Sequence, residues 1–537
     1  MMTRERFLAA IRGGLIVSCQ ADPGDPLDEP AIMAAMAKAA AAGGAVAIRA
    51  EGAANIRAIK AAVALPVIGL RKRRYPDSPV YITPTLEDAL EVVAAGADVV
   101  ALDATARARP GGHPLSSLVE ELKRREVLVM ADVSSLEEGL GAARLGCDLV
   151  STTLSGYTGA ARPQELPDLG LVAALRARLP GDVPVIAEGR IWTPEQAVEA
   201  LNSGAFAVVV GTAITRPAAL TRRIAEALSR HQARLQATAV GVDLGGTRTL
   251  VGLADLSGTL RHEQTFSTPW RSGMAAVVGQ VTQGVQQVIQ TAGVSPCAVG
   301  LAATGRVDVE KGMVVGGVPL AHDYLGYPVR EELSRALGLP VHLENDVNAA
   351  AYAEYQLVPA PRPARFAMVT IGTGVGGGIL VDGHLVRGVN AGEVGHLCVR
   401  QGGRKCGCGA RGCLEAYVSR RLLARQALLL ARRGLVPLAT DREPTADELT
   451  ALLQAGEPHF ASLFSRQLDY LACGLASLTN IVDPEIIVIG GELSALSEHL
   501  LEGLRIRLGP HPPLRCARLG NRAGAVGAAQ LALLHFA

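Results

Sequence analysis

Four residues that lie close together in the chain have the types and spacing of metal ligands. His396 is followed by Cys406, Cys408 and Cys413, in the runs G-E-V-G-H and C-G-C-G-A-R-G-C-L-E. Three thiolates and an imidazole supply the four ligands of a closed tetrahedral Zn²⁺ site. Disulfides or ordinary buried thiols are the alternative, which a nearby ATP-type phosphate loop disfavours because it indicates a reducing compartment. Glu393 and Glu415 flank the motif, so a metal here would also hold two carboxylates in place.

Two glycine-rich segments have the composition of phosphate-binding turns. They are D-L-G-G-T (243–247) and G-T-G-V-G-G-G (372–378), and each follows an apolar run and precedes a second run that ends in Asp. Glycines let backbone N–H groups approach a phosphate. Either segment alone is equally well an ordinary hairpin turn, but the repeat predicts two lobes around an ATP cleft. Neither segment has the spacing of a P-loop.

A carboxylate lies at the expected start of a helix in L-E-N-D-V-N-A-A-A-Y-A-E (343–354). Asn345 and Asp346 are residues that commonly cap helices, which is the structural interpretation. The functional interpretation makes Asp346 the general base that takes a proton from a sugar hydroxyl as it attacks a γ-phosphate. The two roles are compatible.

The first 230 residues contain the elements of a different domain. Eight short apolar runs each precede a segment of helical length, which predicts a buried parallel sheet and a (β/α)₈ barrel. We expect these strands at 15–20, 45–49, 67–72, 98–103, 127–132, 149–153, 183–189 and 207–211.

Polar residues at the ends of these strands are candidates for a site, because barrel chemistry occurs at the carboxyl ends of the strands. Any one of them alone is more simply a solvated loop residue, but a ring of polar groups on apolar strands indicates a function. The residues are Gln20, Arg49, Lys72, Asp103, Asp132, Thr153, Glu188, Gly211 and Thr212.

Composition limits the class of protein. The chain has 537 residues, 49% of them hydrophobic and 19% charged, with a net charge of +1 and 3% aromatic residues. These values predict at least two domains with large cores and give no sign of a nucleic-acid partner. The chain start lacks a signal-peptide pattern, and the Ala-rich run 31–48 is interrupted by Lys38 and glycines. We therefore expect a cytoplasmic protein without a membrane span, with a barrel at 1–232 and a second domain at 237–537.

The second domain resembles the ROK family of sugar kinases, which implies an α/β, two-lobed, actin-like ATPase fold. The resemblance covers residues 239–537. It rests on the glycine-rich segments, G-R-V-D (305–308), L-E-N-D-V-N-A-A, the His and Cys motifs, and D-P-E-I-I-V-I-G-G (483–491). One departure is Arg248, where many members have Lys.

This resemblance implies roles for individual residues, with ATP and Mg²⁺ as the kinase co-substrate and Zn²⁺ as a structural metal. Asp346 is the implied catalytic base. The implied sugar-binding residues are Gly305, Arg306, Asn345, Glu393, His396 and Glu415. The implied ATP-binding residues are Asp243, Gly245, Gly246, Thr247, Gly372, Thr373, Gly374, Gly376, Gly377, Gly490 and Gly491. Because some ROK proteins are repressors with a DNA-binding segment, a regulatory role is an alternative, but here a barrel takes that place.

Residues 1–228 resemble N-acetylmannosamine-6-phosphate 2-epimerases. The resemblance rests on G-G-L-I-V-S-C-Q-A, A-V-A-I-R-A-E-G, Y-P-D-S-P-V-Y-I-T-P-T, T-L-S-G-Y-T, P-V-I-A-E-G-R-I and V-V-G-T-A-I-T-R-P. It implies that Lys72 and Glu188 are the catalytic pair and that no cofactor is needed. The implied substrate-binding residues are Gln20, Arg49, Asp132, Gly189, Arg190, Gly211, Thr212 and Arg216.

The chemistry of C2 epimerisation fits these residue types. A base must remove the proton next to the C1 aldehyde of the open-chain sugar. A lysine acts as that base at neutral pH only if its pKa falls well below the usual value of about 10.4. Burial at the barrel mouth and the charges of Arg71, Arg73 and Arg74 are expected to lower the pKa of Lys72.

Together the two resemblances predict a bifunctional enzyme of amino-sugar and sialic acid breakdown. The kinase would phosphorylate N-acetylmannosamine at O6, and the epimerase would convert that product to N-acetylglucosamine 6-phosphate. Its partners would be amino sugars and ATP, with a homo-oligomer expected. The alternatives are a ROK glucokinase or N-acetylglucosamine kinase fused to another sugar-phosphate barrel, and a sugar-sensing regulator with an inactive kinase fold.

Overall fold

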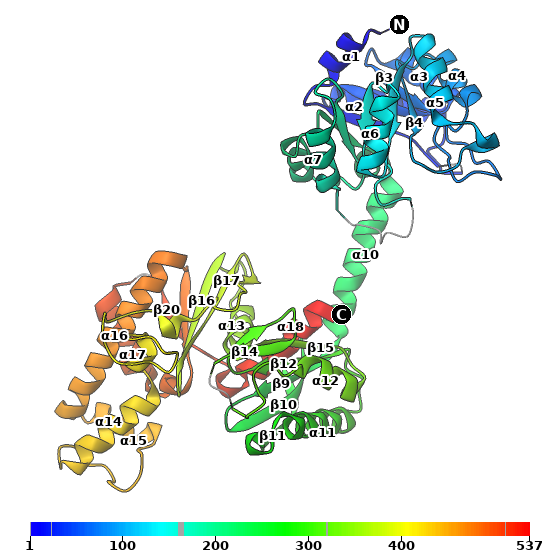
Figure 1. The fold of residues 1–537 in the computed structure, drawn as a ribbon. Coiled ribbons are helices and arrows are strands. Elements are labelled where there is room, and N and C mark those ends of the chain that lie inside the picture. Colours follow the sequence, from blue (N-terminus) through cyan, green and yellow to red (C-terminus); the bar gives the residue numbers. More distant parts are fainter. Residues whose placement is uncertain (1, 23, 159–165, 318–319, 511, 537) are drawn as a thin grey trace. The chain divides into compact units, whose positions relative to one another are not determined.

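The computed structural model describes residues 2–22, 24–158, 166–317, 320–510 and 512–536 (Figure 1). The chain divides into two compact units, Met1–Ala227 and Leu228–Ala537. The first unit is a barrel, and the second contains two five-stranded sheets and one two-stranded sheet. Among the described residues, no helix combines the length and the apolar character that crossing a bilayer requires.

The first unit is a closed barrel of eight parallel strands, as predicted. Strand β8 pairs with β1, with Ile16 opposite Val209, so the sheet has no free edge. The strands are β1 Leu15–Cys19, β2 Ala47–Glu51, β3 Val67–Leu70, β4 Val99–Asp103, β5 Leu128–Asp132, β6 Leu149–Ser151, β7 Val185–Glu188 and β8 Ala207–Val210.

Helices alternate with these strands and cover the barrel, except for the last helix, which runs past the end of the first unit at Ala227. They are α1 Arg4–Ile11, α2 Pro30–Ala42, α3 Ala53–Ala62, α4 Leu86–Ala94, α5 Leu115–Arg124, α6 Leu136–Arg144, α7 Leu169–Arg178, α8 Pro194–Asn202, α9 Thr212–Thr215 and α10 Pro217–Gln236. The last of these has no buried residue along its whole length.

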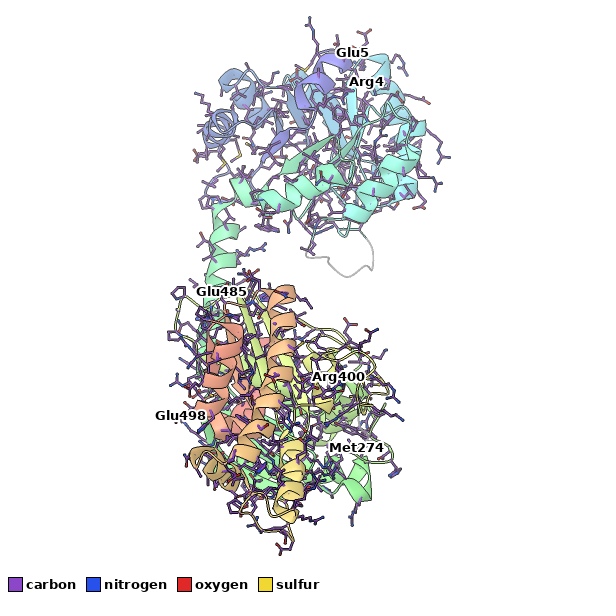
Figure 2. All side chains as sticks on the ribbon, turned by 90° about the vertical axis from the view of Figure 1, so that its left-hand side faces the viewer. Arg4, Glu5, Met274, Arg400, Glu485 and Glu498 are labelled. Atoms are coloured by element: carbon purple, nitrogen blue, oxygen red, sulfur yellow. The ribbon has the colours of Figure 1, made fainter. Side chains whose placement is uncertain are left out.

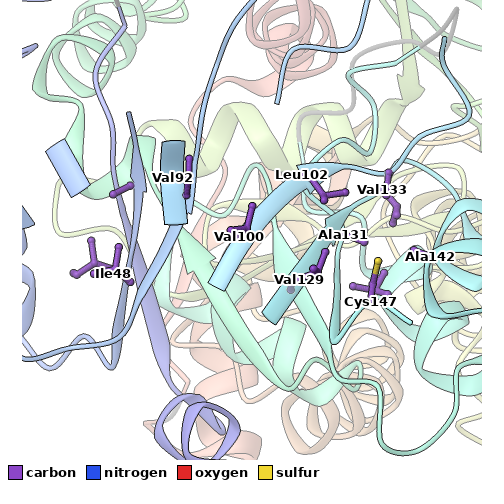
Figure 3. Packing of buried hydrophobic residues seen from close by; sticks show 14 of the residues in the cluster. Ile48, Val92, Val100, Leu102, Val129, Ala131, Val133, Ala142 and Cys147 are labelled. Carbon is purple, nitrogen blue, oxygen red and sulfur yellow. The ribbon is translucent and has the colours of Figure 1, made fainter. Parts of the chain in front are cut away.

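The barrel strands are apolar on both faces because each face is covered. One set of strand side chains packs against the helices, and Figure 3 shows part of this layer, with Ile48, Val100 and Val129 from strands and Val92 from α4. The other set fills the interior, where Phe7 of α1 packs with it. Every second residue of a strand therefore points toward the barrel axis.

All eight strands differ from their expected ranges by one or two residues at one end or both, and in three of them the difference changes the position of a functional residue relative to the strand. Strand β3 ends at Leu70, so Lys72 lies beyond the strand and forms an isolated bridge with Ile82. Strand β2 runs to Glu51, which places Arg49 within the strand. Strand β6 ends at Ser151, before Thr153. The apolar runs predicted all eight strands and the last residues of β4 and β5, but not the last residues of the other six.

The second unit contains two five-stranded sheets with the same arrangement. Their orders are β11-β10-β9-β12-β15 and β18-β17-β16-β19-β20, and each contains an antiparallel pair, β9–β10 or β16–β17, next to parallel strands. The predicted internal repeat and two-lobed fold are confirmed. In Figure 2 Met274 marks the start of α11, and Glu485 precedes β19.

The elements of this unit have the following bounds. The strands are β9 Thr238–Leu244, β10 Arg248–Asp255, β11 Leu260–Ser267, β12 Ala298–Ala303, β13 Arg306–Asp308, β14 Met313–Gly316, β15 Val341–Asn345, β16 Arg365–Ile371, β17 Val375–Val381, β18 His384–Leu385, β19 Ile486–Gly490 and β20 Leu514–Cys516. The helices are α11 Met274–Ala292, α12 Val329–Leu337, α13 Asp346–Gln356, α14 Arg420–Arg432, α15 Ala446–Gln454, α16 Pro458–Val482, α17 Ser497–Leu508 and α18 Ala523–Phe536.

Helix α18 packs directly on the backbone of the first sheet. A Cβ on Gly241 or on Gly300 would lie 1.9 Å from a carbonyl oxygen of this helix, and one on Gly527 would lie 1.7 Å from the carbonyl oxygen of Ala349 in α13. Only glycine permits this approach. The contact holds β9, β12 and α13 together, and these are the elements that carry Asp243 and Asp346.

Candidate active sites and metal site

A buried arginine organises the mouth of the barrel. Arg49 is 1% exposed, and its two terminal nitrogens contact both carboxylate oxygens of Asp132 at 3.0 and 2.6 Å. One of these nitrogens also donates to Glu188 at 2.8 Å. The structure therefore brings together three residues expected at the site, from β2, β5 and β7.

A hydroxyl connects the two carboxylates of this cluster. Thr153 contacts Asp132 at 2.6 Å and Glu188 at 3.0 Å. Burial raises the pKa of Glu188, and the negative charge of Asp132 raises it further, while Arg49 opposes the shift. Glu188 therefore keeps its proton to a higher pH than an exposed glutamate.

Lys72 shows the opposite shift. Burial lowers its pKa, and the positive charges of Arg216 and Arg49 lower it further, while Asp22 and Glu51 oppose the change. The positive charge of Lys72 in turn lowers the pKa of Glu188, so the lysine amine lies near enough to this cluster to act on it.

The prediction that the neighbouring arginines lower the pKa of Lys72 is wrong. Arg71 pairs with Glu51 and Glu91, and Arg73 pairs with Asp88 and Glu91, so acidic partners offset their charges. The charges that act on Lys72 come from arginines distant in sequence.

The other residues expected at the barrel site lie in turns after β1, β7 and β8. Gln20 is buried and donates to Ser18 at 2.9 Å. Arg190 has a left-handed backbone and donates to the carbonyl of Ser155 at 2.6 Å. Gly189 precedes it with a φ of 109°, and Gly211 and Thr212 begin α9.

Arg216, at the end of α9, forms an ion pair with Asp22, with a second nitrogen to oxygen distance of 3.0 Å. Sequence reasoning missed Asp22, because an exposed carboxylate in a Pro- and Gly-rich turn carries no motif. This pair places an anion against the arginine expected to bind phosphate.

In the second unit, three parallel strands end at one edge of the sheet, and carboxylates expected at the site lie at this edge. Leu244, Ala303 and Asn345 lie in one row across β9, β12 and β15. The residues that follow each strand, among them Asp346, therefore leave the sheet at the same level. This register was not evident from the sequence.

Asp346 begins α13 and is fixed by several donors. One carboxylate oxygen accepts from Asn345 at 3.0 Å and from the Val347 amide at 2.9 Å, and the other accepts from Thr304 at 2.9 Å. Burial raises the pKa of Asp346, while these hydrogen bonds oppose the shift. Asn345 caps the helix, so the capping interpretation of the motif is correct for that residue.

Asp243 lies close to this base. Burial raises the pKa of Asp243 to about 7, the negative charge of Asp346 adds to the shift, and Arg248 opposes it. The turn that follows, with Gly245, Gly246 and Thr247, is closed by a hydrogen bond from the Gly245 amide to the carbonyl of Arg248 at 3.1 Å. The first glycine-rich segment and the expected base thus form one cluster.

The second glycine-rich segment divides into a turn and a strand. Gly372, Thr373 and Gly374 form the turn, and the amide of Gly372 bonds to the carbonyl of Gly374 at 2.9 Å. Gly376 and Gly377 lie inside β17, where added Cβ atoms would meet Val347 at 2.6 Å and Val394 at 2.3 Å. Packing therefore requires glycine at both positions.

Gly490 ends β19 opposite Thr370, and Gly491 follows it. A Cβ on Gly491 would lie 2.6 Å from the backbone of Ile371. The two glycines are therefore next to the turn at 372–374.

Glu415 ties this turn to the cysteine-rich segment. Its carboxylate accepts from the Val375 amide at 2.9 Å, and a Cβ on Gly374 would lie 2.4 Å from it.

Two more residues expected to bind the sugar lie at the start of β13. Gly305 has a φ of 108°, and Arg306 donates to Asn390 at 2.8 Å. Arg306 and Asn390 thus join β13 to the loop before Glu393.

The four expected metal ligands lie together. Each of the four residues offers one ligand atom, and these atoms lie within 4.8 Å of one another. The residues are His396, Cys406, Cys408 and Cys413. The Cys408 and Cys413 sulfurs are 3.7 Å apart, and the Cys406 sulfur is 3.7 Å from Nδ1 of His396. Zinc–sulfur bonds of about 2.3 Å give tetrahedral edges of about 3.8 Å, so the donor set fits this ion.

The second ring nitrogen of His396 faces a carboxylate instead of the cysteines. Its Nε2 lies 3.7 Å from the carboxylate of Glu393. With Nδ1 directed at the metal site, Nε2 is left to hydrogen-bond a carboxylate or a ligand. The imidazole therefore connects the cysteine cluster to the glutamate expected to bind sugar.

Comparison with known proteins covers both units. Residues 33–230 match the family model NanE, described as "Putative N-acetylmannosamine-6-phosphate epimerase", and residues 239–534 match the ROK family model. A "Putative N-acetylmannosamine-6-phosphate 2-epimerase" of Caldanaerobacter subterraneus is 56% identical over 219 residues, which are 40% of this chain and 92% of that protein.

One kind of relative spans the whole chain. The "Bifunctional enzyme NanE/NanK" of Brucella melitensis is 38% identical over 547 aligned residues, which cover 99% of this chain and 98% of that protein. A solved ROK family transcriptional regulator, a homologue of E. coli MLC protein, has a TM-score of 0.51 and 22% identity over 62% of this chain and 91% of its own, which supports the fold of the second unit. The chain therefore belongs to the bifunctional NanE/NanK family, and its second unit to the ROK family.

Proposed function

We propose that this chain carries out two consecutive reactions of amino-sugar breakdown. Its kinase, residues 237–537, phosphorylates N-acetylmannosamine at O6 with ATP. Its epimerase, residues 1–232, inverts C2 of the product to give N-acetylglucosamine 6-phosphate. The observation that carries the proposal is the 38% identity to a NanE/NanK enzyme along 99% of the chain, which spans both units.

In the epimerase, Lys72 and Glu188 are the acid–base pair. A lowered lysine pKa favours the neutral amine, which takes the C2 proton, and a raised glutamate pKa favours the carboxylic acid, which returns a proton from a different direction. Arg49 and Asp132 hold the open-chain sugar. Gln20 binds the sugar, and Gly189, Arg190, Gly211, Thr212 and Arg216 receive its phosphate.

In the kinase, Asp346 accepts the proton of the O6 hydroxyl as it attacks the γ-phosphate. Asn345, Glu393, His396, Glu415, Gly305 and Arg306 bind the sugar. The turns at 243–247 and 372–374, with Gly490 and Gly491, bind ATP. Asp243 is the carboxylate placed to hold Mg²⁺, which neutralises phosphate charge when bound. Gly376 and Gly377, which follow the second turn at the start of β17, complete the proposed ATP-binding set and also have a packing role.

We further propose that the metal at His396, Cys406, Cys408 and Cys413 is zinc with a structural role. The nine free cysteines support a reducing, cytoplasmic location. A homo-oligomer remains a prediction.

The proposal is tested by supplying N-acetylmannosamine and ATP to the purified chain and following the products by NMR. N-acetylmannosamine 6-phosphate should form first and N-acetylglucosamine 6-phosphate second. Without ATP no sugar phosphate should form. If glucose or N-acetylglucosamine is phosphorylated with a higher kcat/KM than N-acetylmannosamine, the assigned kinase substrate is wrong.

A further inference from the structure

A threonine that no motif identifies lies between the first phosphate turn and the proposed base. Strands β9, β12 and β15 place Leu244, Ala303 and Asn345 in one row. Thr304 follows the middle strand and Asp346 follows the outer one, so their side chains emerge at the same edge. This register, rather than any sequence spacing, brings them together.

Thr304 contacts one carboxylate oxygen of Asp346 while other donors serve its second oxygen. The threonine hydroxyl donates to Oδ2 at 2.9 Å and also lies 3.4 Å from the carbonyl of Leu244. Oδ1 accepts from Asn345 and the Val347 amide. Each carboxylate oxygen therefore has its own donor, and Thr304 serves the one directed toward β9 and β12.

The backbone of Thr304 is itself held in place. The Tyr324 hydroxyl donates to the carbonyl of Thr304 at 2.5 Å, and Tyr324 is only 2% exposed. The Trp270 ring packs edge-on against Tyr324 with centroids 5.2 Å apart, and its Nε1 donates to the carbonyl of Gly245 at 3.3 Å. Two aromatic residues thus connect the phosphate turn to Thr304.

The charges around Asp346 make this donor necessary. Asp243 of β9 is a second carboxylate close enough to act on it, and the neutral Tyr324 hydroxyl faces it from the 320–328 loop. Burial and a like charge both favour the protonated acid, which cannot accept a proton from a sugar. Hydrogen bonds to the ionised form oppose them.

We infer that Thr304, held by Tyr324, is a positioning residue that keeps Asp346 ionised and aimed at the attacking hydroxyl. The inference rests on the proposed role of Asp346 as base. A hydroxyl that donates to a carboxylate stabilises the charged form, so its removal shifts the base toward the protonated form.

The test is the pH dependence of kinase kcat/KM in Thr304→Val and Thr304→Ser. Valine keeps the shape of threonine and removes the donor, so the acid limb should move up by about one pH unit. At a pH well below the wild-type acid limb kcat should fall about tenfold, with KM for sugar and ATP changed less than threefold. Serine retains the hydroxyl and should restore both. Thr282→Val is the matched control, because the Thr282 hydroxyl is buried without a hydrogen-bond partner among the described residues.

An unchanged acid limb in Thr304→Val, or equal losses in the Ser and Val variants, would overturn the inference. If Thr304→Val does not fold, Tyr324→Phe decides, because it removes only the hydroxyl that holds Thr304 and should shift the limb in the same direction. An unshifted limb in Tyr324→Phe then counts against the inference. Asp346→Asn separates the two claims: if it retains kinase kcat within tenfold, the base assignment itself is wrong. A dead Asp346→Asn with a normal Thr304→Val refutes only the role of Thr304.

Discussion

At the scale of residues, the barrel site combines two groups whose pKa values move toward each other. The pKa of Lys72 is lowered, so its neutral fraction grows as pH rises through a value below that of a free lysine. The pKa of Glu188 is raised, so its acid form persists as pH rises past the usual range for glutamate. The epimerase kcat/KM should therefore be bell-shaped, with both limbs closer to neutrality than those of unperturbed side chains.

Lys72→Ala should stop exchange of the C2 proton of N-acetylmannosamine 6-phosphate in D₂O. Without the amine no base removes this proton, and the loss should be about 10² to 10⁴-fold. NMR at saturating substrate measures the exchange, and Lys38→Ala, which removes an exposed lysine of α2, is the control. If exchange continues at saturation and only KM rises, Lys72 binds phosphate and the base is another group.

The metal site gives a second test at this scale. Cys408→Ser should lose the metal and raise the kinase KM for sugar by about tenfold or more, because His396 would no longer be oriented toward Glu393. KM for ATP should change less. Metal analysis and steady-state kinetics measure the two effects, and Cys473→Ser, at an exposed cysteine outside the cluster, is the control. A full metal complement in an active Cys408→Ser variant would reject the ligand assignment.

At the scale of elements, the kinase site depends on how closely α18 approaches β9 and β12. The Gly300 position has no room for a methyl group, because its Cβ would lie 1.9 Å from the carbonyl oxygen of Ala528. The neighbouring atom is backbone and cannot turn away. Displacing α18 would shift the strands that align Asp243, Thr304 and Asp346.

Gly300→Ala should therefore destabilise the second unit by about 1–3 kcal/mol or more. Gly279→Ala is the matched control, since this glycine of α11 has open space at its Cβ and should gain about 0.5–1 kcal/mol from better helix propensity. Urea unfolding of the full chain measures both. Equal stability of the two variants would contradict the close-packing account.

At the scale of the whole molecule, the two proposed sites belong to separate compact units. Lys72→Ala should accumulate N-acetylmannosamine 6-phosphate from N-acetylmannosamine and ATP, while Asp346→Asn should make no sugar phosphate. A mixture of the two variants should again form N-acetylglucosamine 6-phosphate, because the intermediate is a free solute. A mixture that produces none would show that one chain must contain both intact sites.

The sequence by itself predicted the parts of this protein that local patterns determine. Apolar runs predicted eight barrel strands, because strands covered on both faces must be apolar along their length. The repeated glycine turns predicted the two related sheets, and the His396 and cysteine spacing predicted the metal cluster, since these residues are near neighbours in the chain.

Only the tertiary structure determined which distant groups act on one another. Asp22, Arg216 and Lys72 are far apart in the chain and meet because the barrel closes. Thr304 meets Asp346 because two parallel strands are in a particular register. Strand ends such as those before Lys72 and Thr153 were also set by pairing rather than by local composition. Burial, register and charge are properties of the packed chain, and they determine the protonation of Lys72, Glu188 and Asp346.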